Sequence, residues 1–293
     1  MQPFVAIIMV NYNGFNDTVE CVESLKKISY SNYEIIVVDN HSTEAPTAWQ
    51  LEYLQLHTRY IANNINLGFS GGNNVGIQMA KELGAQYVLL INNDTTVKED
   101  FLDVLVEASI KNPNCGIVGG KIKFHKHPDL IWFGGGEFDK KTGEGKHQRW
   151  NCVDNENIDE IKKVTFLTGC LMLIPMSVIS TVGMLEEKYF LYSEDTEYCC
   201  RVMASQYQLL YCDNAVIFHK VSASTGEKSD ISQYYMIRNK LYIVKEYCEK
   251  TYLCYARIFW KLAKDIVRGR MDLMPNLRGV YDFMRGKTGQ WKR

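Results

Sequence analysis

One segment of this chain decides its fold: YVLLINNDTT, at residues 87–96. Its first five residues are apolar and rich in Val, Ile and Leu, which is typical of a buried parallel strand. The strand ends in a polar cluster with one carboxylate, Asp94. Ligands of open α/β sheets bind outside the carboxyl ends of strands, where an acid can hold a divalent cation and, through it, a phosphate. The alternative is a simple Asx-type turn before the next helix.

Length and composition are those of an ordinary globular protein. A chain of 293 residues suits one large domain or two closely packed ones. Hydrophobic residues at 46% and charged residues at 23% allow a sizeable core. The net charge of -1 gives no general attraction to nucleic acid, so no such partner is expected. The nine cysteines include no C-x-x-C pair that would indicate zinc, and reduced thiols in a cytoplasmic protein are the simplest account.

Two further patterns bear on the location of the protein. Residues 1–10 have no basic n-region and no cleavage-type site, so they are not expected to form a secretory signal. No run of about 18 apolar residues suggests a spanning helix. We therefore expect a cytoplasmic protein, with a peripheral position on the inner face of the cell membrane as the alternative.

Strands and helices are predicted to alternate around the opening segment. A strand at residues 4–10 precedes a helix that is capped by Asn16 or Asp17, and a second strand follows at residues 33–38. The short connections predict a right-handed parallel unit. The pattern continues with a helix over about 47–56, a strand at 59–61, a helix ending near 83, the strand at 87–91, a helix over about 98–111 and a strand at 115–122.

Beyond residue 122 this alternation ends. Residues 123–163 are loop-rich and are expected to cover a site rather than to build the sheet. Residues 164–174 are apolar with Gly169 inside, which predicts one strand where the backbone approaches a ligand. The remaining predictions are a helix at 177–182, a helix from Ser193 or Asp195 to about 203, strands at 209–211 and 215–218, and helices from residue 233 onward.

A glycine-rich segment occupies residues 63–76. We predict a loop that leads into a helix, with exposed backbone N–H groups that suit a phosphate. The segment matches neither the G-x-G-x-x-G pattern nor the P-loop pattern, which argues against dinucleotide oxidoreductases and P-loop NTPases. The alternative is that the glycines serve only the local geometry.

The last part of the chain is basic. From Arg257 onward, basic residues far outnumber Asp265, Asp272 and Asp282, and they are accompanied by residues such as Phe259 and Trp260. A basic amphipathic helix indicates a membrane surface. A solvated face packed on the domain is the alternative.

Four features now follow one another along the chain: a strand that ends at Asp39, the glycine-rich segment, residues 92–94 and residues 192–195. Their order and spacing resemble those of the family 2 inverting glycosyltransferases, which have a GT-A fold. Residues 63–77, 92–95, 168–169, 194–195 and 235–239 look like the rhamnosyltransferase branch of that family. The resemblance covers residues 4–240, and five weak motifs in the same order are specific.

The resemblance implies an α/β fold of the GT-A type, a Rossmann-like mixed sheet flanked by helices with a C-terminal helical extension. Residues 1–225 would be the catalytic domain, with a nucleotide-binding half at 1–97 and an acceptor half at 98–225. Residues 226–293 would be the helical, basic extension.

The same resemblance implies that Asp195 is the catalytic base and that Glu194 orients it or binds the acceptor. Inversion needs a single in-line displacement in which a carboxylate takes the proton of the attacking hydroxyl group, and it needs no covalent nucleophile. N–H groups at a helix start would hold Asp195 ionised. The alternative for Asp195 is plain N-capping.

A metal ion and a nucleotide are implied as well. Asp94 matches the last position of the D-x-D motif of the family, whose first acid is replaced here by Asn92. The implied cofactor is Mg²⁺ or Mn²⁺, because such an ion needs only one or two carboxylates besides phosphate oxygens and neutralises charge on the departing nucleoside diphosphate. His219 matches a supporting position for the metal, with a structural role as the alternative.

The remaining candidates surround the two substrates. Asp39 can accept the N3–H of uracil or thymine, and Arg238 and Lys220 are expected to contact the diphosphate. The implied nucleotide-binding residues are Val10, Asn11, Tyr12, Asn13, Asp39, Asn66, Gly68, Gly72, Asn73, Asn92, Asn93 and Arg238. The acceptor candidates are Trp132, Phe133, Thr168 and Gly169, with Trp150 as a further stacking candidate and core or lid packing as the alternative for the aromatic residues.

The expected function is metal-dependent sugar transfer, with inversion, to a hydroxyl group of a cell-surface glycan or a lipid-linked saccharide. By resemblance the donor is dTDP-rhamnose, followed by UDP-galactofuranose or a UDP-hexose. A nucleotidyltransferase would want a basic residue in its first loop, and residues 11–14 contain none. An inactive nucleotide- or glycan-binding subunit is the non-enzymatic alternative. The feature that favours it is Asn92, which replaces the first acid of the D-x-D motif.

Overall fold

The computed structural model describes residues 2–155, 161–221 and 229–291. Its first half alternates strands and helices in the order β1 (Val5–Asn11), α1 (Phe15–Leu25), β2 (Tyr33–Asp39), α2 (Ala48–His57), β3 (Arg59–Ala62), α3 (Gly68–Glu82) and β4 (Tyr87–Ile91). The second half contains β5 (Thr95–Val97), α4 (Phe101–Lys111), β6 (Cys115–Phe124), β7 (Ile131–Phe133), β8 (Gly136–Asp139), β9 (Glu144–His147), β10 (Ile161–Val164), β11 (Leu171–Pro175), α5 (Met176–Val182), α6 (Glu194–Ala204) and β12 (Gln208–His219). Three helices follow: α7 (Asp230–Tyr247), α8 (Thr251–Val267) and α9 (Leu273–Met284).

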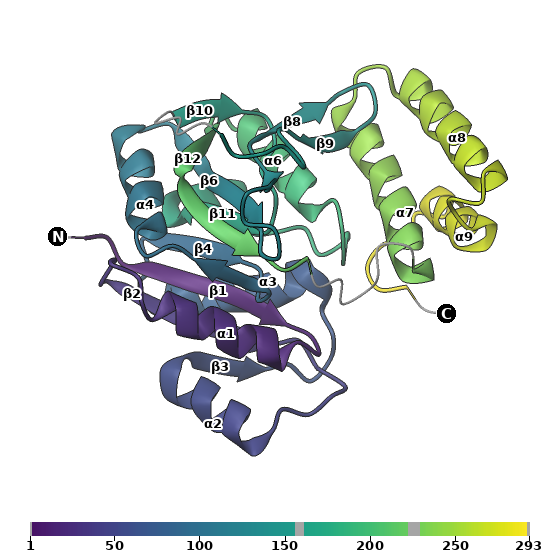
Figure 1. The fold of residues 1–293 in the computed structure, drawn as a ribbon. Coiled ribbons are helices and arrows are strands. Elements are labelled where there is room, and N and C mark those ends of the chain that lie inside the picture. Colours follow the sequence, from purple (N-terminus) through teal and green to yellow (C-terminus); the bar gives the residue numbers. More distant parts are fainter. Residues whose placement is uncertain (1, 156–160, 222–228, 292–293) are drawn as a thin grey trace.

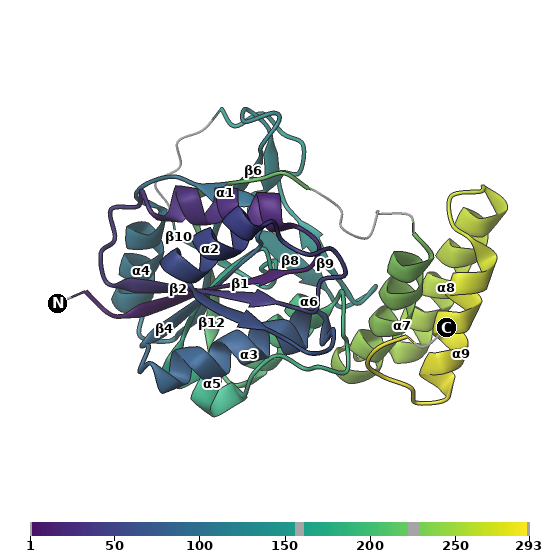
Figure 2. The same ribbon diagram turned by 90° about the horizontal axis from the view of Figure 1, so that it is seen from below.

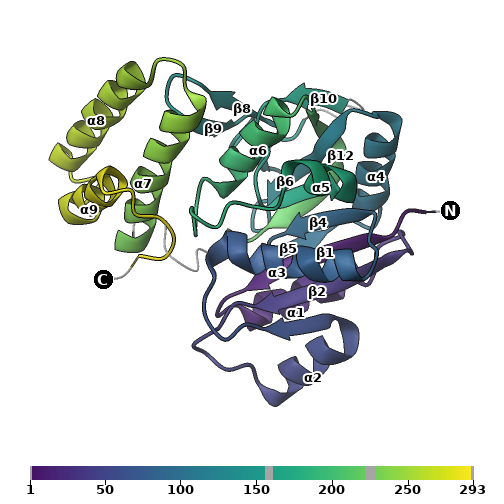
Figure 3. The same cartoon turned by 180° about the vertical axis from the view of Figure 1, so that it is seen from behind.

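One mixed sheet forms the centre of the molecule (Figure 1). The strand order is β10-β12-β6-β11-β4-β1-β2-β3. Strand β1 pairs in parallel with β2 and β4, whereas β11 runs antiparallel between β4 and β6. Helices α1 and α4 cover one face of the sheet, and α3 and α5 cover the other (Figures 2 and 3). The predicted mixed α/β architecture is confirmed.

The helices α7–α9 have an apolar cluster of their own, formed around residues such as Ile237, Leu241 and Ile258. The sheet and its covering helices share a separate and much larger core. Helix α7 lies between the sheet domain and the pair α8–α9 (Figure 2). None of the helices in the described ranges has the length and apolar character needed to cross a bilayer.

The glycine-rich segment differs from the prediction. Helix α3 starts at Gly68, so most of the expected loop is helical. A Cβ atom on Gly72 would lie 2.9 Å from Val10, and one on Gly76 would lie 2.4 Å from Ile8. These glycines therefore let α3 pack closely on β1, which is the geometric alternative considered for them.

Other boundaries also differ. Residues 164–174 are not one strand, because β10 ends at Val164 and a loop through Gly169 precedes β11. The two strands expected near 209–218 form one strand, β12, with an irregular register between Cys212 and Val216. Residues 95–97 form β5 where the sequence predicted the approach to a helix. The predicted side-chain caps at Asn16 or Asp17 are absent, since α1 begins at Phe15 after Gly14.

Candidate active site

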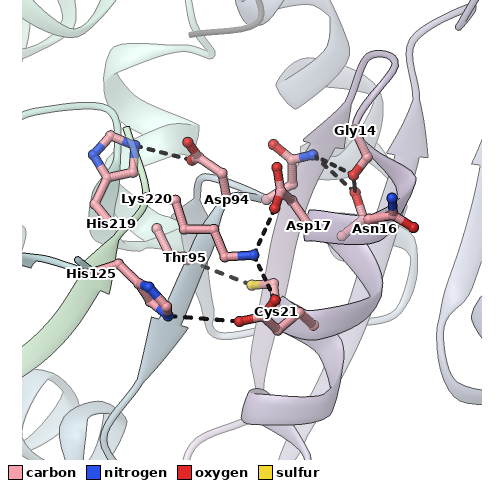
Figure 4. Close-up of polar contacts among 12 residues, drawn as sticks. Gly14, Asn16, Asp17, Cys21, Asp94, Thr95, His125, His219 and Lys220 are labelled. Atoms are coloured by element: carbon pink, nitrogen blue, oxygen red, sulfur yellow. Dashed lines mark hydrogen bonds and ion pairs between the residues drawn. The ribbon is translucent and has the colours of Figure 1, made fainter. Parts of the chain in front are cut away.

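The short strand β5 brings the two proposed metal ligands together. Its residue Thr95 pairs with His219 at the end of β12, and the Lys220 N–H donates to the Asp94 carbonyl at 2.9 Å. Asp94 and His219 are therefore neighbours although 125 positions separate them in the sequence. The His219 Nε2 atom lies 3.0 Å from Asp94 Oδ1 (Figure 4), and both side chains are buried.

These two donors fit a divalent cation. A separation of 3.0 Å is close to that of adjacent ligands in an octahedral shell with bonds of about 2.1 Å. Carboxylate oxygen and imidazole nitrogen are both donors that Mn²⁺ accepts, and carboxylate oxygen suits Mg²⁺. Within the described ranges no group of three or more His, Cys, Asp or Glu side chains could hold a metal. The other coordination positions would thus fall to substrate oxygens and water.

Lys220 does not point toward this pair. Its Nζ atom contacts Asp17 Oδ1 at 2.7 Å and Glu20 Oε2 at 2.6 Å, both on α1 (Figure 4). Burial alone would lower the pKa of Lys220. The hydrogen bonds and charges of Asp17 and Glu20 outweigh burial and raise that pKa above its ordinary value. The expected contact between Lys220 and the diphosphate is therefore not supported by its position.

The proposed base, Asp195, lies in the first turn of α6. Its Oδ2 accepts the Gly169 N–H at 3.1 Å, and its Oδ1 accepts the Thr196 N–H at 2.6 Å. Gly169 belongs to the loop before β11, so two separate segments orient this carboxylate. Burial raises the pKa of Asp195 above its ordinary value, while the two N–H groups oppose that shift by favouring the charged form.

Glu194 is adjacent and has a different environment. It is 7% exposed, and its Oε2 atom has no hydrogen-bond partner in the described part of the chain. Burial, followed by the charge of Asp195, raises the pKa of Glu194 well above the usual range of a carboxylic acid. Because Asp195 accepts two backbone N–H bonds through its carboxylate, ionisation is favoured at Asp195 relative to Glu194.

One cavity of about 610 Å³ joins these groups. Asp94 and His219 line it together with Glu194 and Asp195. Of the other residues singled out from the sequence, the cavity is lined by Val10, Tyr12, Asn66, Gly68, Asn92, Asn93, Trp132, Thr168 and Gly169. The residues that do not line it are Asn11, Asn13, Asp39, Gly72, Asn73, Phe133, Trp150, Lys220 and Arg238. Trp150 is exposed, so its expected stacking on an acceptor sugar is not supported by its position.

Two of the residues outside the lining, Asn11 and Asp39, are joined by a hydrogen bond. Asn11 is fully buried, donates to Asp39 Oδ1 at 2.9 Å, and accepts the Gly14 N–H at 3.1 Å. Asp39 Oδ1 also accepts the Ser42 hydroxyl group. Phe133 is 1% exposed and packs in the core, which is the alternative considered for it.

Asn40, which the sequence did not single out, organises the start of α3. Its Nδ2 donates to the Gly68 carbonyl at 2.9 Å, and its Oδ1 accepts the Leu67 N–H at 3.1 Å. The Gly68 N–H donates to Asn66 Oδ1, and the Phe69 N–H donates to the Phe190 carbonyl. Three N–H groups at this helix start are therefore already paired, which disfavours the predicted phosphate cradle.

Arg238 and Asn239 form a clamp on the loop before α6. The Arg238 side chain is fully buried and donates to the carbonyls of Lys188, Tyr189 and Gly289. Asn239 Nδ2 donates to the carbonyls of Tyr189, Leu191 and Tyr192 at 2.7–2.9 Å. The expected diphosphate contact of Arg238 is thus not supported, because its guanidinium group holds the backbone.

The cavity has further lining residues that were not among the site residues expected from the sequence, although Tyr235 belongs to the motif at 235–239. His147 lines it, and its Nδ1 lies 3.1 Å from the Trp132 carbonyl. Burial lowers the pKa of His147, so the neutral ring donates through Nδ1 and keeps a lone pair on Nε2. Tyr235 and Trp291 line the cavity from α7 and from the segment after α9.

A comparison with family models agrees with this geometry. The model described as "Glycosyl transferase family 2" matches residues 6–183. The chain belongs to glycosyl transferase family 2. The predicted family and the predicted enzyme class, a glycosyltransferase, are thereby confirmed.

Three curated relatives show how this family 2 member compares in length and sequence. The chain is 24% identical to "Low-salt glycan biosynthesis hexosyltransferase Agl10" of Haloferax volcanii, over 99% of this chain and 94% of the relative. It is 23% identical to "N-acetylglucosaminyl-diphospho-decaprenol L-rhamnosyltransferase" of Mycobacterium tuberculosis, over 77% of this chain and 79% of the relative. It is 27% identical to "Uncharacterized protein y4gI" of Sinorhizobium fredii over 77% of this chain, but spans only 25% of that relative's length.

Solved structures confirm the GT-A fold expected for a family 2 glycosyltransferase. "GalNAc-T7 with UDP, GalNAc and Mn2+" superposes with a TM-score of 0.68 at 16% identity, over 85% of this chain and 49% of that chain. The mannosyltransferase PcManGT from Pyrobaculum calidifontis "in complex with GDP-Man and Mn2+" gives a TM-score of 0.62 at 13% identity, over 96% and 74% of the two chains. At such identities the likeness concerns the fold alone.

Proposed function

We propose that this protein moves a sugar, with inversion, from a nucleoside diphosphate sugar to a hydroxyl group of a saccharide acceptor. The observation that carries the proposal is that Asp94 and Asp195 line the same cavity. A cavity of about 610 Å³ has room for a drug-sized ligand. An inverting transfer needs both a site that holds the leaving diphosphate and a carboxylate base for the incoming hydroxyl group.

Asp195 would act as the base. Its raised pKa makes its carboxylate a better proton acceptor, while the N–H groups of Gly169 and Thr196 hold the carboxylate in one orientation. The acceptor hydroxyl group would give its proton to Asp195 as its oxygen attacks the anomeric carbon. That carbon loses its bond to the diphosphate oxygen, which keeps the electron pair. Glu194, whose neutral form is favoured by burial, would donate a hydrogen bond.

Asp94 and His219 would hold Mg²⁺ or Mn²⁺. Such an ion supplies neutralisation of the charge that develops on the departing diphosphate. Asn92, which lines the cavity at the position of the missing acid, leaves the site less negative. We expect the metal to bind more tightly when the diphosphate supplies further oxygen ligands.

For the donor we propose dTDP-rhamnose, with UDP-galactofuranose or a UDP-hexose as alternatives. The support is the rhamnosyltransferase among the relatives and the state of Asp39, whose Oδ1 is held by Asn11 and Ser42. A carboxylate fixed in this way can present its other oxygen to the N3–H of a thymine or uracil base. Val10 and Tyr12 at the end of β1 would contact the nucleoside.

For the acceptor we propose a cell-surface glycan or a lipid-linked saccharide, with the protein at a membrane surface through α8 and α9. Helix α8 exposes Tyr252, Phe259, Trp260 and Val267, with exposed fractions of 41–87%. The neighbouring exposed positions are basic: Arg257, Lys261, Lys264 and Arg268. Apolar residues beside cations suit an anionic lipid surface, where each Lys or Arg adds ~1 kcal/mol of binding.

The donor is tested by thermal shift with a panel of nucleotide sugars, each with and without Mn²⁺ or Mg²⁺. We expect dTDP-rhamnose to raise the melting temperature more than any UDP-sugar, and only with metal present. A larger shift with a UDP-sugar would contradict the rhamnose assignment and leave the enzyme class intact.

Transfer itself is tested with Asp195→Asn. This variant should abolish transfer and leave the donor-induced shift unchanged, because the base does not contact the nucleotide. Asp94→Asn should instead weaken the metal-dependent shift. Full transfer by Asp195→Asn would refute the assignment of the base. No transfer from any donor by the wild-type protein, with binding intact, would favour the non-enzymatic alternative of a nucleotide- or glycan-binding subunit.

A further inference from the structure

A segment that follows α9 returns to the cavity. Residues 285–291, here called the strap, leave the end of α9 and run back across α7. The Gly289 N–H donates to the Lys188 carbonyl at 2.7 Å, and the Gly289 carbonyl accepts Arg238 Nη1 at 2.7 Å. The Trp291 N–H donates to the Tyr235 hydroxyl group at 2.7 Å. Gly289 therefore joins the strap to the loop that precedes Glu194, and Gly289 and Trp291 both join it to α7.

The strap completes an aromatic wall of the cavity. The Trp291 ring stacks on Tyr234 with centroids 4.5 Å apart and an interplanar angle of 14°. Tyr234 contacts Tyr235 edge to face at 5.1 Å, and Tyr235 stacks on Phe190 at 5.4 Å and 18°. Three of these four rings, Phe190, Tyr235 and Trp291, line the cavity. Gln290, next to Trp291, also lines it and adds an amide group.

This wall has the chemistry to hold a sugar ring. One face of a pyranose presents C–H groups, and the electron-rich face of an aromatic ring attracts them. The hydroxyl groups at the ring edge need polar partners, and the Gln290 amide can donate and accept. The polar groups proposed for the nucleotide lie instead at the carboxyl edge of the sheet, after β1 and β4, with Asp39 at the end of β2 outside the lining.

We propose that Phe190, Tyr235 and the strap form the acceptor subsite, in which Trp291 contacts the apolar face of a pyranose and Gln290 binds its hydroxyl groups. The inference rests on the proposed function, since it assigns the second substrate to a particular wall of the same cavity. It gives residues 285–291 a role in choosing the acceptor. Neither Trp291 nor Gln290 was singled out by sequence reasoning.

The test measures saccharide binding directly. Methyl pyranosides of common hexoses are added to the whole protein with Mn²⁺ and dTDP or UDP, and binding is followed by saturation-transfer NMR. We expect at least one pyranoside to bind the wild-type protein through its ring C–H protons. Trp291→Ala should weaken that affinity about tenfold, whereas Trp291→Phe should stay within about threefold because an aromatic face remains.

Trp49→Ala is the matched control. Trp49 lies on α2, also stacks on a tyrosine, Tyr53, and is not part of the cavity lining. It should leave pyranoside binding unchanged, and all three variants should bind the nucleotide as the wild type does. Wild-type pyranoside affinity in Trp291→Ala, equal loss of nucleotide affinity in that variant, or no binding of any pyranoside to the wild type would each overturn the proposal. Because no donor sugar is used, failure of the transferase assignment would appear separately, in the transfer assay.

Discussion

Glu194 and Asp195 are adjacent carboxylates with opposite environments. Asp195 accepts backbone N–H groups from Gly169 and Thr196, which favour its charged form. Glu194 is buried with one oxygen unpaired among the described residues, so its neutral form is favoured. Two acids whose environments separate their pKa values can divide the roles of base and hydrogen-bond donor.

The pH dependence of transfer tests this division. Because the base must be ionised, kcat/KM should fall as the pH drops through the raised pKa of Asp195. Glu194 is expected to be neutral in the pH range of this acid limb, so Glu194→Gln should leave the limb in place. The same variant should remove any change in kcat/KM that ionisation of Glu194 causes at higher pH. Profiles of kcat/KM from about pH 5 to about pH 9 for both proteins provide the measurement. An acid limb that moves to lower pH in Glu194→Gln would assign the first ionisation to Glu194.

At the scale of elements, the loop at residues 188–193 decides where Asp195 lies. Phe190, Tyr192 and Ser193 all have left-handed backbone conformations, with φ of 64°, 66° and 70°. Such conformations are unfavourable for residues other than glycine, at roughly 1–2 kcal/mol each. The loop keeps them because Arg238 and Asn239 on α7 bind its carbonyl groups.

Asn239→Ala should therefore reduce transfer more than it reduces nucleotide affinity. The substitution removes the amide that binds three carbonyls of the loop, and we expect a loss of ~1–3 kcal/mol in the free energy of unfolding. Donor-induced thermal shift and kcat, measured well below the melting temperature, separate the two effects. Unchanged kcat in Asn239→Ala would show that the loop does not depend on the clamp.

Ser193→Gly is a control at the same loop, because it should raise the free energy of unfolding that Asn239→Ala lowers. Glycine adopts a φ of 70° without steric cost, which relieves roughly 1–2 kcal/mol of backbone strain, whereas its greater freedom in the unfolded chain costs about 0.4–1 kcal/mol. The variant should therefore be more stable than the wild type by about 1 kcal/mol or less. It should also restore part of the stability lost in Asn239→Ala.

On the scale of the whole molecule, α8 and α9 form the surface farthest from the sheet (Figures 1 and 2). Helix α9 exposes five large apolar side chains on one face, flanked by Arg278 and Arg285: Leu273, Met274, Leu277, Tyr281 and Met284. Exposed apolar patches of this kind mark interaction surfaces. The strap connects the end of α9 to the wall of the cavity that we assign to the acceptor.

Flotation with vesicles measures this association. We expect the protein to float with vesicles that contain phosphatidylglycerol, and less with purely zwitterionic ones. Trp260→Glu combined with Leu277→Glu should abolish flotation, since two charges would replace apolar anchors. Leu56→Glu is the control, because Leu56 is 74% exposed on α2, away from α8 and α9. Equal flotation of all variants would exclude the membrane role, and a dimer that only the double variant dissociates would assign the surface to a second copy.

The sequence predicted the parts of the fold that follow from local patterns. The strands at the centre of the sheet have continuous apolar runs, and their type is confirmed, with the bounds 87–91 met at both ends and those of the others within two residues. Strand β5 has three residues and no pattern of its own, so only its pairing with β12 defines it. The strand predicted at 164–174 fails for a similar reason: local hydrophobicity cannot reveal that the chain must turn at Gly169 to reach Asp195.

For the site, the sequence by itself determined the acids at the ends of elements, Asp94 and Asp195, because their flanking patterns place them at a strand end and a helix start. Only the tertiary structure decided their partners. Asp94 meets His219 through strand pairing across 125 positions, and Arg238, predicted at the diphosphate, holds backbone carbonyls instead. Trp291 reaches the cavity because the strap folds back over α7. Such contacts depend on how segments distant in the sequence pack together, and this packing produces no local hydrophobic pattern from which it could be predicted.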